Sequence, residues 1–123
     1  MRNNTLGRSY KDGEVIIKQG TVGDCVYVIQ KGKVAVIKEN KESDVKVAEL
    51  GEKEFFGEMA LFEKDVRSCT VRAVGNANIL TLDKKNFYKT IQKDPSIAFR
   101  LLERMSARLR EANKYATSQD PVI

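Results

Sequence analysis

The chain has 123 residues, of which 41% are hydrophobic and 32% are charged, and its formal net charge is +5. These proportions are typical of a folded globular protein and argue against wholesale disorder, and the length predicts a single domain. The sequence contains no histidine, which excludes Ser-His-Asp and Cys-His catalysis and leaves too few ligands for a metal site. We therefore expect a protein that is not an enzyme and that holds neither a metal nor a cofactor.

The sequence gives no sign of export or of membrane insertion. No apolar run approaches the length of a membrane span, and the first ten residues lack the apolar stretch of a signal peptide. Cys25 and Cys69 each lie in a strand-like segment, where cysteine usually acts as a small buried hydrophobe and not as half of a disulfide. We expect a cytoplasmic chain with no membrane contact.

The chain up to about residue 83 alternates short β-branched segments with turn residues, which is the pattern of β-strands. The expected strands span residues 14–18, 25–30, 33–38, 45–50, 69–74 and 77–82. Glycines, among them Gly32 and Gly75, fall in the gaps between them. Many short strands at such spacing favour a sandwich, a barrel or a jelly roll.

After residue 83 the pattern becomes helical. Asp83 can cap a helix over about residues 84–93, and Asp94-Pro95 begins a second helix over about residues 95–115. The second helix repeats small and apolar residues at the spacing of a coiled-coil seam: Ala98, Leu102, Met105, Leu109, Ala112 and Ala116. This seam predicts a homodimer. Another row can instead dock the helix on its own domain, and both contacts can hold on different faces: Ile97, Leu101 and Arg108.

The excess positive charge lies in this helical part. Residues 83–114 contain nine Lys or Arg and four Asp or Glu, a net charge of +5, so the rest of the chain sums to zero. A basic helical surface can contact nucleic acid or an acidic partner. Because no recognition helix and no aromatic-basic pattern accompanies the charge, we interpret it as a solvated helix face and do not expect nucleic-acid binding.

Residues 55–73, FFGEMALFEKDVRSCTVRA, contain the pattern most indicative of function. Gly57 leads into a short helical stretch, and a helix N-terminus offers unpaired N–H groups to an anion. The carboxylate of Glu58 suits a sugar hydroxyl, and the planar fork of Arg67 suits two phosphate oxygens. A cyclic nucleotide requires this combination. Loop Glu and Arg are common, however, so the spacing alone leaves the nature of the site open.

The same segment resembles the phosphate-binding cassette of the cyclic-nucleotide-binding domain family, which catabolite activator proteins and protein kinase A regulatory subunits share. The family pattern, Phe-Gly-Glu-(Leu/Met)-Ala-Leu and then Arg with two small residues, stands here as residues 56–61 and 67–69. The likeness extends over about residues 10–115. It implies a mainly β fold, a double-stranded β-helix (jelly roll) of about eight strands over residues 10–83 with C-terminal helices, in a stand-alone domain over residues 1–123.

The resemblance also implies a ligand, cyclic AMP with cyclic GMP as the alternative, and a role for each cassette residue. Glu58 would accept the ribose 2′-hydroxyl, and Arg67 would neutralise the cyclic phosphate. The backbone N–H groups of Gly57, Glu58 and Met59 would surround the phosphate, and Ser68 would add its N–H and hydroxyl.

By the same resemblance, the base meets the long helix near Ala112 and Asn113, with Arg108 about one turn earlier. These helix residues can equally be solvated. Four residues are expected to line the pocket behind the base: Val45, Val47, Val71 and Ala73. The chain would then be a regulatory module that signals to an unknown effector protein by rearranging this helix.

Two departures from the family pattern bear on these expectations. Val66 stands where many members have Pro, and Ser68-Cys69 stands where others have Ala-Ala, which leaves the choice between adenine and guanine open. The alternative is a degenerate β-roll that has lost its ligand and acts only as an interaction or dimerisation domain. Retention of both Glu58 and Arg67 argues against that alternative.

Overall fold

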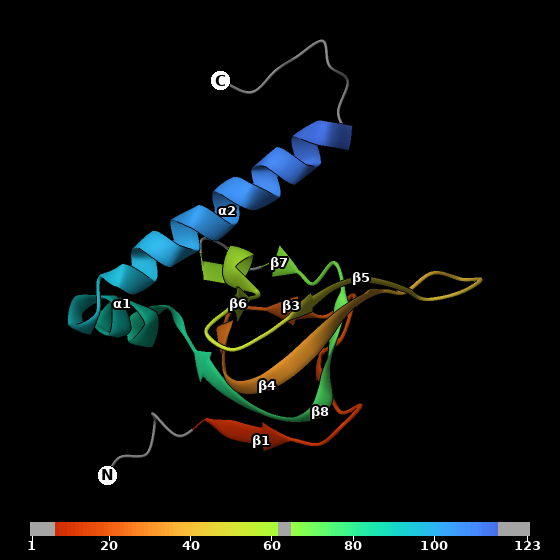
Figure 1. The fold of residues 1–123 in the computed structure, drawn as a ribbon, viewed down its shortest axis with the longest axis horizontal. Coiled ribbons are helices and arrows are strands. Elements are labelled where there is room, and N and C mark those ends of the chain that lie inside the picture. Colours follow the sequence, from red (N-terminus) through yellow and green to blue (C-terminus); the bar gives the residue numbers. More distant parts are fainter. Residues whose placement is uncertain (1–6, 62–64, 116–123) are drawn as a thin grey trace. The chain divides into compact units, whose positions relative to one another are not determined.

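A computed structural model describes residues 7–61 and 65–115 (Figure 1). The strands in this part of the chain are β1 (Arg8–Tyr10), β2 (Val15–Ile17), β3 (Val22–Gly23), β4 (Val26–Lys38), β5 (Val45–Leu50), β6 (Phe55–Phe56), β7 (Asp65–Val66) and β8 (Thr70–Leu82). The helices are the 3-10 helix η2 (Glu58–Leu61), α1 (Lys84–Lys93) and α2 (Ser96–Tyr115). The prediction of a mainly β chain with C-terminal helices is confirmed.

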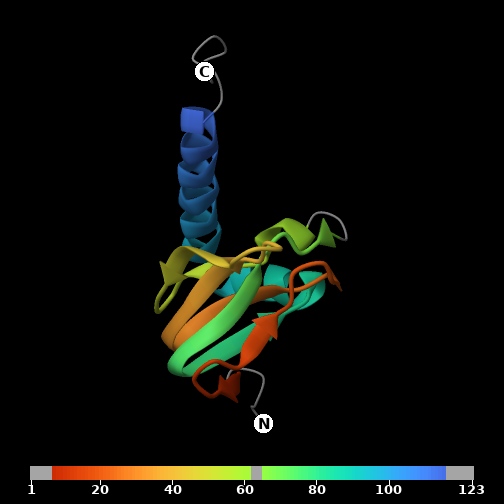
Figure 2. The same cartoon turned by 90° about the vertical axis from the view of Figure 1, so that its right-hand side faces the viewer.

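The chain divides into two compact units, one that ends at Phe87 and one that begins at Tyr88. In the first unit, β4 and β8 pair antiparallel along their whole length, from Val26 opposite Leu82 to Ile37 opposite Thr70. Strands β1 and β5 form the edges of this sheet, β2 also pairs with β8, and β6 also pairs with β4. Figures 1 and 2 show the two long strands curving side by side. Strands β3 and β7 form a separate small sheet.

The predicted strand breaks at Gly32 and Gly75 are wrong. Both glycines lie inside long strands, with φ angles of 88° and 68°. The pairing continues across them with a shifted register, from Lys31 opposite Asn78 to Lys33 opposite Val74. A positive φ at glycine bends a strand without ending its ladder, so four expected strands merge into two.

The core of the first unit is built mainly from buried residues of the two long paired strands, β4 and β8. Ile29 and Val34 of β4 and Ile79 of β8 are fully buried. Burial of an aliphatic side chain of this size contributes about 1.5–3 kcal/mol each. Phe56 joins this core and stacks on Tyr27, with ring centroids 5.0 Å apart. Because β6 is anchored in the core, the residues that follow it start from a fixed point.

Both predicted helix caps are present. The Asn86 N–H donates to Oδ1 of Asp83 (2.8 Å) at the start of α1, and the Ser96 N–H donates to Oδ1 of Asp94 (3.2 Å) at the start of α2. The hydrogen bond from the Ser96 hydroxyl is the main cause that lowers the pKa of Asp94. Both caps satisfy N–H groups that a helix leaves unpaired. Neither α1 nor α2 is long and apolar enough to cross a membrane.

Helix α2 has one strongly buried residue among those whose side chains are described, Leu101, which is 7% exposed. Ile97, in the same expected docking row, is half-buried, and Arg108 is exposed. Leu102 and Leu109, from the predicted seam, are 64% and 56% exposed. Ala116 lies outside the described residues, and the side chain of Ala112 is not described.

Candidate ligand-binding site

The backbone of Arg67 is held by the segment that follows β2. The Gly20 N–H donates to the Arg67 carbonyl (2.8 Å), and the Arg67 N–H donates to the Thr21 carbonyl (2.7 Å). These bonds extend the β3–β7 ladder, in which Val22 lies opposite Val66. The arginine side chain therefore starts from a backbone that is bonded on both of its polar groups.

The guanidinium of Arg67 is buried, with the residue 8% exposed. Its Nη1 donates to the Gly57 carbonyl (3.2 Å), and its Nη2 donates to the Cys25 carbonyl (2.9 Å). Its Cζ lies 5.7 Å from the centroid of the Tyr27 ring. Carbonyl oxygens and the electron-rich face of an aromatic ring both stabilise a buried cation.

Two glycines leave room for this guanidinium. A Cβ on Gly23 would lie 2.2 Å from Nε and from Nη2 of Arg67, so any side chain there would displace the arginine. Gly57 has a φ of 79°, and its Cβ would lie 2.8 Å from Nη1 of Arg67. Close approach and left-handed backbone both favour glycine at Gly57. Gly57 therefore allows the backbone turn and also leaves the space that the Arg67 side chain occupies.

Glu58 follows directly, in the first turn of η2, and is 0% exposed. Met59 is 47% exposed and Ser68 is also exposed. Among the described residues, the buried polar or charged side chains are Glu58, Arg67 and Thr70. Because burial of a charge is costly, a carboxylate and a guanidinium buried within ten residues of each other make this segment the candidate functional site.

Three neighbours of Arg67 were missed by the sequence analysis as parts of the site: Gly23, Cys25 and Tyr27. Burial raises the pKa of the Tyr27 hydroxyl, partly opposed by the positive charge of Arg67. Burial and the hydrogen bond to Asp24 raise the pKa of the Cys25 thiol. Nothing in the local sequence marks a backbone carbonyl as an acceptor, so only the Gly23-Asp24 pair in the family's glycine framework could have drawn attention to this segment.

The remaining predicted site residues lie in sequence outside residues 56–61 and 67–69, which match the cassette pattern. Arg108 and Asn113 are on α2, in the second unit, where Arg108 is exposed and Asn113 is half-buried. Of the expected pocket residues, Val71 and Ala73 are buried in the core, whereas Val45 and Val47 are 47% and 54% exposed.

Cys25 and Cys69 are free thiols. Over residues 7–61 and 65–115 the structure has no group of three or more acidic, cysteine or histidine side chains placed to hold a metal ion.

Fold and site together define a small antiparallel roll with a buried carboxylate and a buried guanidinium on one short segment. The sequence profile of the "Cyclic nucleotide-binding domain" family matches residues 7–94. The chain therefore belongs to the cyclic nucleotide-binding domain family, as the resemblance of the cassette predicted.

Relatives and solved structures agree with this assignment. The chain is 33% identical to the cyclic AMP receptor protein of Thermus thermophilus over 107 residues, which are 86% of this chain and 50% of the relative. It is 38% identical to the cAMP-dependent protein kinase regulatory subunit of Mucor circinelloides over 82 residues, 67% of this chain and 19% of the relative. The chain thus spans half or less of these relatives.

The crystal structure of the Thermus thermophilus catabolite activator protein matches with a TM-score of 0.74 and 33% identity, over 86% of this chain and 50% of that one. A cAMP-bound structure of the EAL enzyme Bd1971 matches with a TM-score of 0.63 and 29% identity, over 86% of this chain and 28% of that one. These neighbours confirm the jelly-roll class of the fold.

Proposed function

We propose that this domain is a regulatory module that binds cyclic AMP through Glu58 and Arg67 and has no catalytic activity of its own. The observation that carries the proposal is the burial of both charged side chains, 0% and 8% exposed, on one segment of the roll. Relatives described as a cyclic AMP receptor protein and as cAMP-dependent kinase regulatory subunits support cyclic AMP as the ligand.

The geometry around Arg67 suits a phosphate. A guanidinium has five N–H donors, and the two bonds to the Gly57 and Cys25 carbonyls leave others for phosphate oxygens. In a buried site such charge-assisted bonds are stronger than in water. The carboxylate of Glu58 would accept the ribose 2′-hydroxyl, while the N–H groups of Gly57 and Met59 and the exposed Ser68 would complete the phosphate site.

Calorimetric titration with cyclic AMP and cyclic GMP tests this proposal. We expect micromolar or tighter binding of cyclic AMP. Arg67→Ala should weaken it by about 2–4 kcal/mol, a factor of about thirty to a thousand, because a charge-assisted phosphate contact is lost. Glu58→Ala should cost less, because it removes a hydrogen bond to a neutral hydroxyl.

Arg8→Ala is the control for charge, because Arg8 lies on the edge strand β1 and pairs with Glu14 at the surface. Binding by Arg67→Ala that equals binding by the parent would contradict the assignment of the site. Absence of binding by the parent would favour a roll that serves only as an interaction domain.

The signal would leave through α2. In this proposal Arg108 and Asn113 meet the base, so that the ligand binds one placement of the helix better than the other. The difference in affinity between the two placements sets the largest shift that the ligand can produce. The effector would be another protein in the cytoplasm, and two copies of the domain would associate through the apolar residues of α2.

A further inference from the structure

A network of polar side chains surrounds Thr70, which follows Arg67 by three residues. Thr70, which is 0% exposed, accepts a hydrogen bond from the Gln19 N–H (3.0 Å) and donates one to Oε2 of Glu39. Nζ of Lys18 donates to both carboxylate oxygens of Glu39, at 2.9 and 2.8 Å. The hydroxyl of Thr70 therefore joins three stretches of chain that are far apart in sequence.

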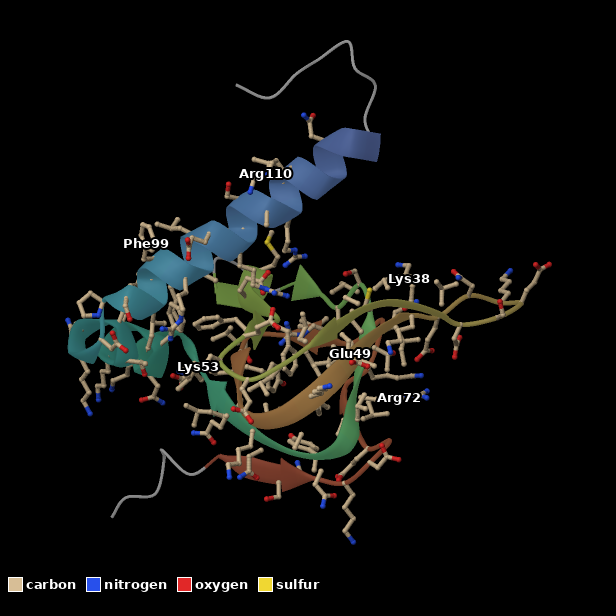
Figure 3. The ribbon with its side chains drawn as sticks, in the orientation of Figure 1. Lys38, Glu49, Lys53, Arg72, Phe99 and Arg110 are labelled. Atoms are coloured by element: carbon tan, nitrogen blue, oxygen red, sulfur yellow. The ribbon has the colours of Figure 1, made fainter. Side chains whose placement is uncertain are left out.

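Two of these stretches are joined a second time, through the side chain of Gln19. Its Nε2 donates to the Glu39 carbonyl (3.1 Å), and its Oε1 accepts the Glu39 N–H (2.8 Å). Nζ of Lys38 donates to the Ser68 carbonyl (2.9 Å). Figure 3 labels Lys38, the last residue of β4, which precedes Glu39 in the chain. The end of β4 is thus bonded both to the segment before β3 and to the cassette.

The network is connected to Arg67 at two places, through Gln19 and through Thr70. Gln19 precedes Gly20, whose N–H donates to the Arg67 carbonyl, and Thr70 follows Arg67 by three residues. We propose that Thr70 and Glu39 are positioning residues for Arg67, so that they set phosphate affinity without touching the ligand. This inference rests on the proposed function, because it assumes that Arg67 contacts the phosphate.

The charges around Glu39 support this role. The hydrogen bond from Lys18, then that from Thr70, lowers the pKa of Glu39, and the charge of Arg72 acts in the same direction. The carboxylate therefore stays ionised at neutral pH and continues to accept from Thr70. Fixing a binding side chain in advance raises affinity, because less freedom is lost when the ligand arrives.

The test compares Thr70→Val, which removes the hydroxyl at nearly constant volume, with Thr70→Ser, which keeps it. We expect Thr70→Val and Glu39→Gln each to weaken cyclic AMP binding about tenfold, and Thr70→Ser to bind like the parent. Glu49→Gln is the matched control, because Glu49 also accepts from a lysine, Lys46 (2.8 Å), but on the edge strand β5.

Two readouts separate positioning from a general loss of structure. In the Arg67→Lys background, Thr70→Val should change the affinity for cyclic AMP less than threefold, because the guanidinium that Thr70 positions is absent. The NMR signal of the Arg67 Nε–H, assigned by its loss in Arg67→Lys, should shift or broaden in ligand-free Thr70→Val and Glu39→Gln, but not in Glu49→Gln.

An unchanged Nε–H signal in Glu39→Gln and Thr70→Val, or an equal loss of affinity in both backgrounds, would overturn the inference. If Thr70→Val does not fold, Glu39→Gln provides the same two readouts. Failure of the parent to bind cyclic AMP would refute the proposed function instead, and the ligand-free NMR comparison would still decide whether the network positions Arg67.

Discussion

The cassette and the helix α2 depart in opposite ways from the usual rule that charged side chains are exposed and large apolar side chains are buried. In the cassette, charged side chains are buried, with Glu58 at 0% and Arg67 at 8% exposure. In α2, large apolar side chains are exposed, with Phe99 and Leu102 at 64% and Leu109 at 56%. Figure 3 shows Phe99 projecting from this helix.

Each departure has a cost that binding can remove. The buried guanidinium of Arg67 is stabilised by an anion, and the buried carboxylate of Glu58 is stabilised by a hydroxyl donor. An exposed apolar face is stabilised by a partner that excludes water. Under the proposed function, the roll holds the cyclic nucleotide and the exposed apolar side chains of α2 are available to a second copy of the domain. The following predictions test the two halves of this comparison.

The largest effect is expected on self-association. Leu102→Glu combined with Leu109→Glu should abolish a dimer formed through α2, because two charges would be placed in its apolar seam. Sedimentation or light scattering at high micromolar concentration measures the loss. Arg100→Glu with Ala107→Glu places the same spacing of acids on another face of the helix and should leave the dimer. A parent that is monomeric at these concentrations would refute the idea.

A smaller effect is expected from Gly57→Ala. The φ of 79° at Gly57 is unfavourable for alanine, and its Cβ would lie 2.8 Å from Nη1 of Arg67. We expect a loss of about 1 kcal/mol of stability and about tenfold weaker binding of cyclic AMP.

Gly75→Ala is the control for Gly57→Ala, because Gly75 has a φ of 68° but its Cβ would meet nothing within 4 Å. Thermal unfolding should show a similar loss of stability in both variants, while calorimetry should show weaker binding only in Gly57→Ala. Equal affinities in the two variants would mean that the close approach at Gly57 does not matter for the ligand.

The smallest expected effect links the two regions. If α2 responds to the ligand, amide hydrogen exchange in residues 100–115 should slow several-fold on addition of cyclic AMP, together with exchange in the cassette. Arg67→Ala should remove both changes. If hydrogen exchange slows only in the cassette, the helix does not respond to the nucleotide.

Local chemistry made much of this protein predictable. Asp83 and Asp94 cap helices because a carboxylate next to free N–H groups is stabilising in any fold, so the caps could be predicted from sequence. The buried Glu58 and Arg67 were found because their residue types match a short family pattern. In contrast, Gly32 and Gly75 were assigned to gaps, because sequence does not distinguish a glycine that ends a strand from one that bends it.

The sequence by itself determined the class of fold, the helices and the two charged residues of the cassette, since periodicity, capping and motif are properties of short stretches. Only the tertiary structure decided what surrounds Arg67. The Cys25 carbonyl, the Tyr27 ring and the Thr70–Glu39 bond come from segments separated by up to about forty residues. They meet because β4 and β8 pair over their whole length with a register that shifts near Lys31, and that pairing is decided by which side chains the whole sheet can bury together.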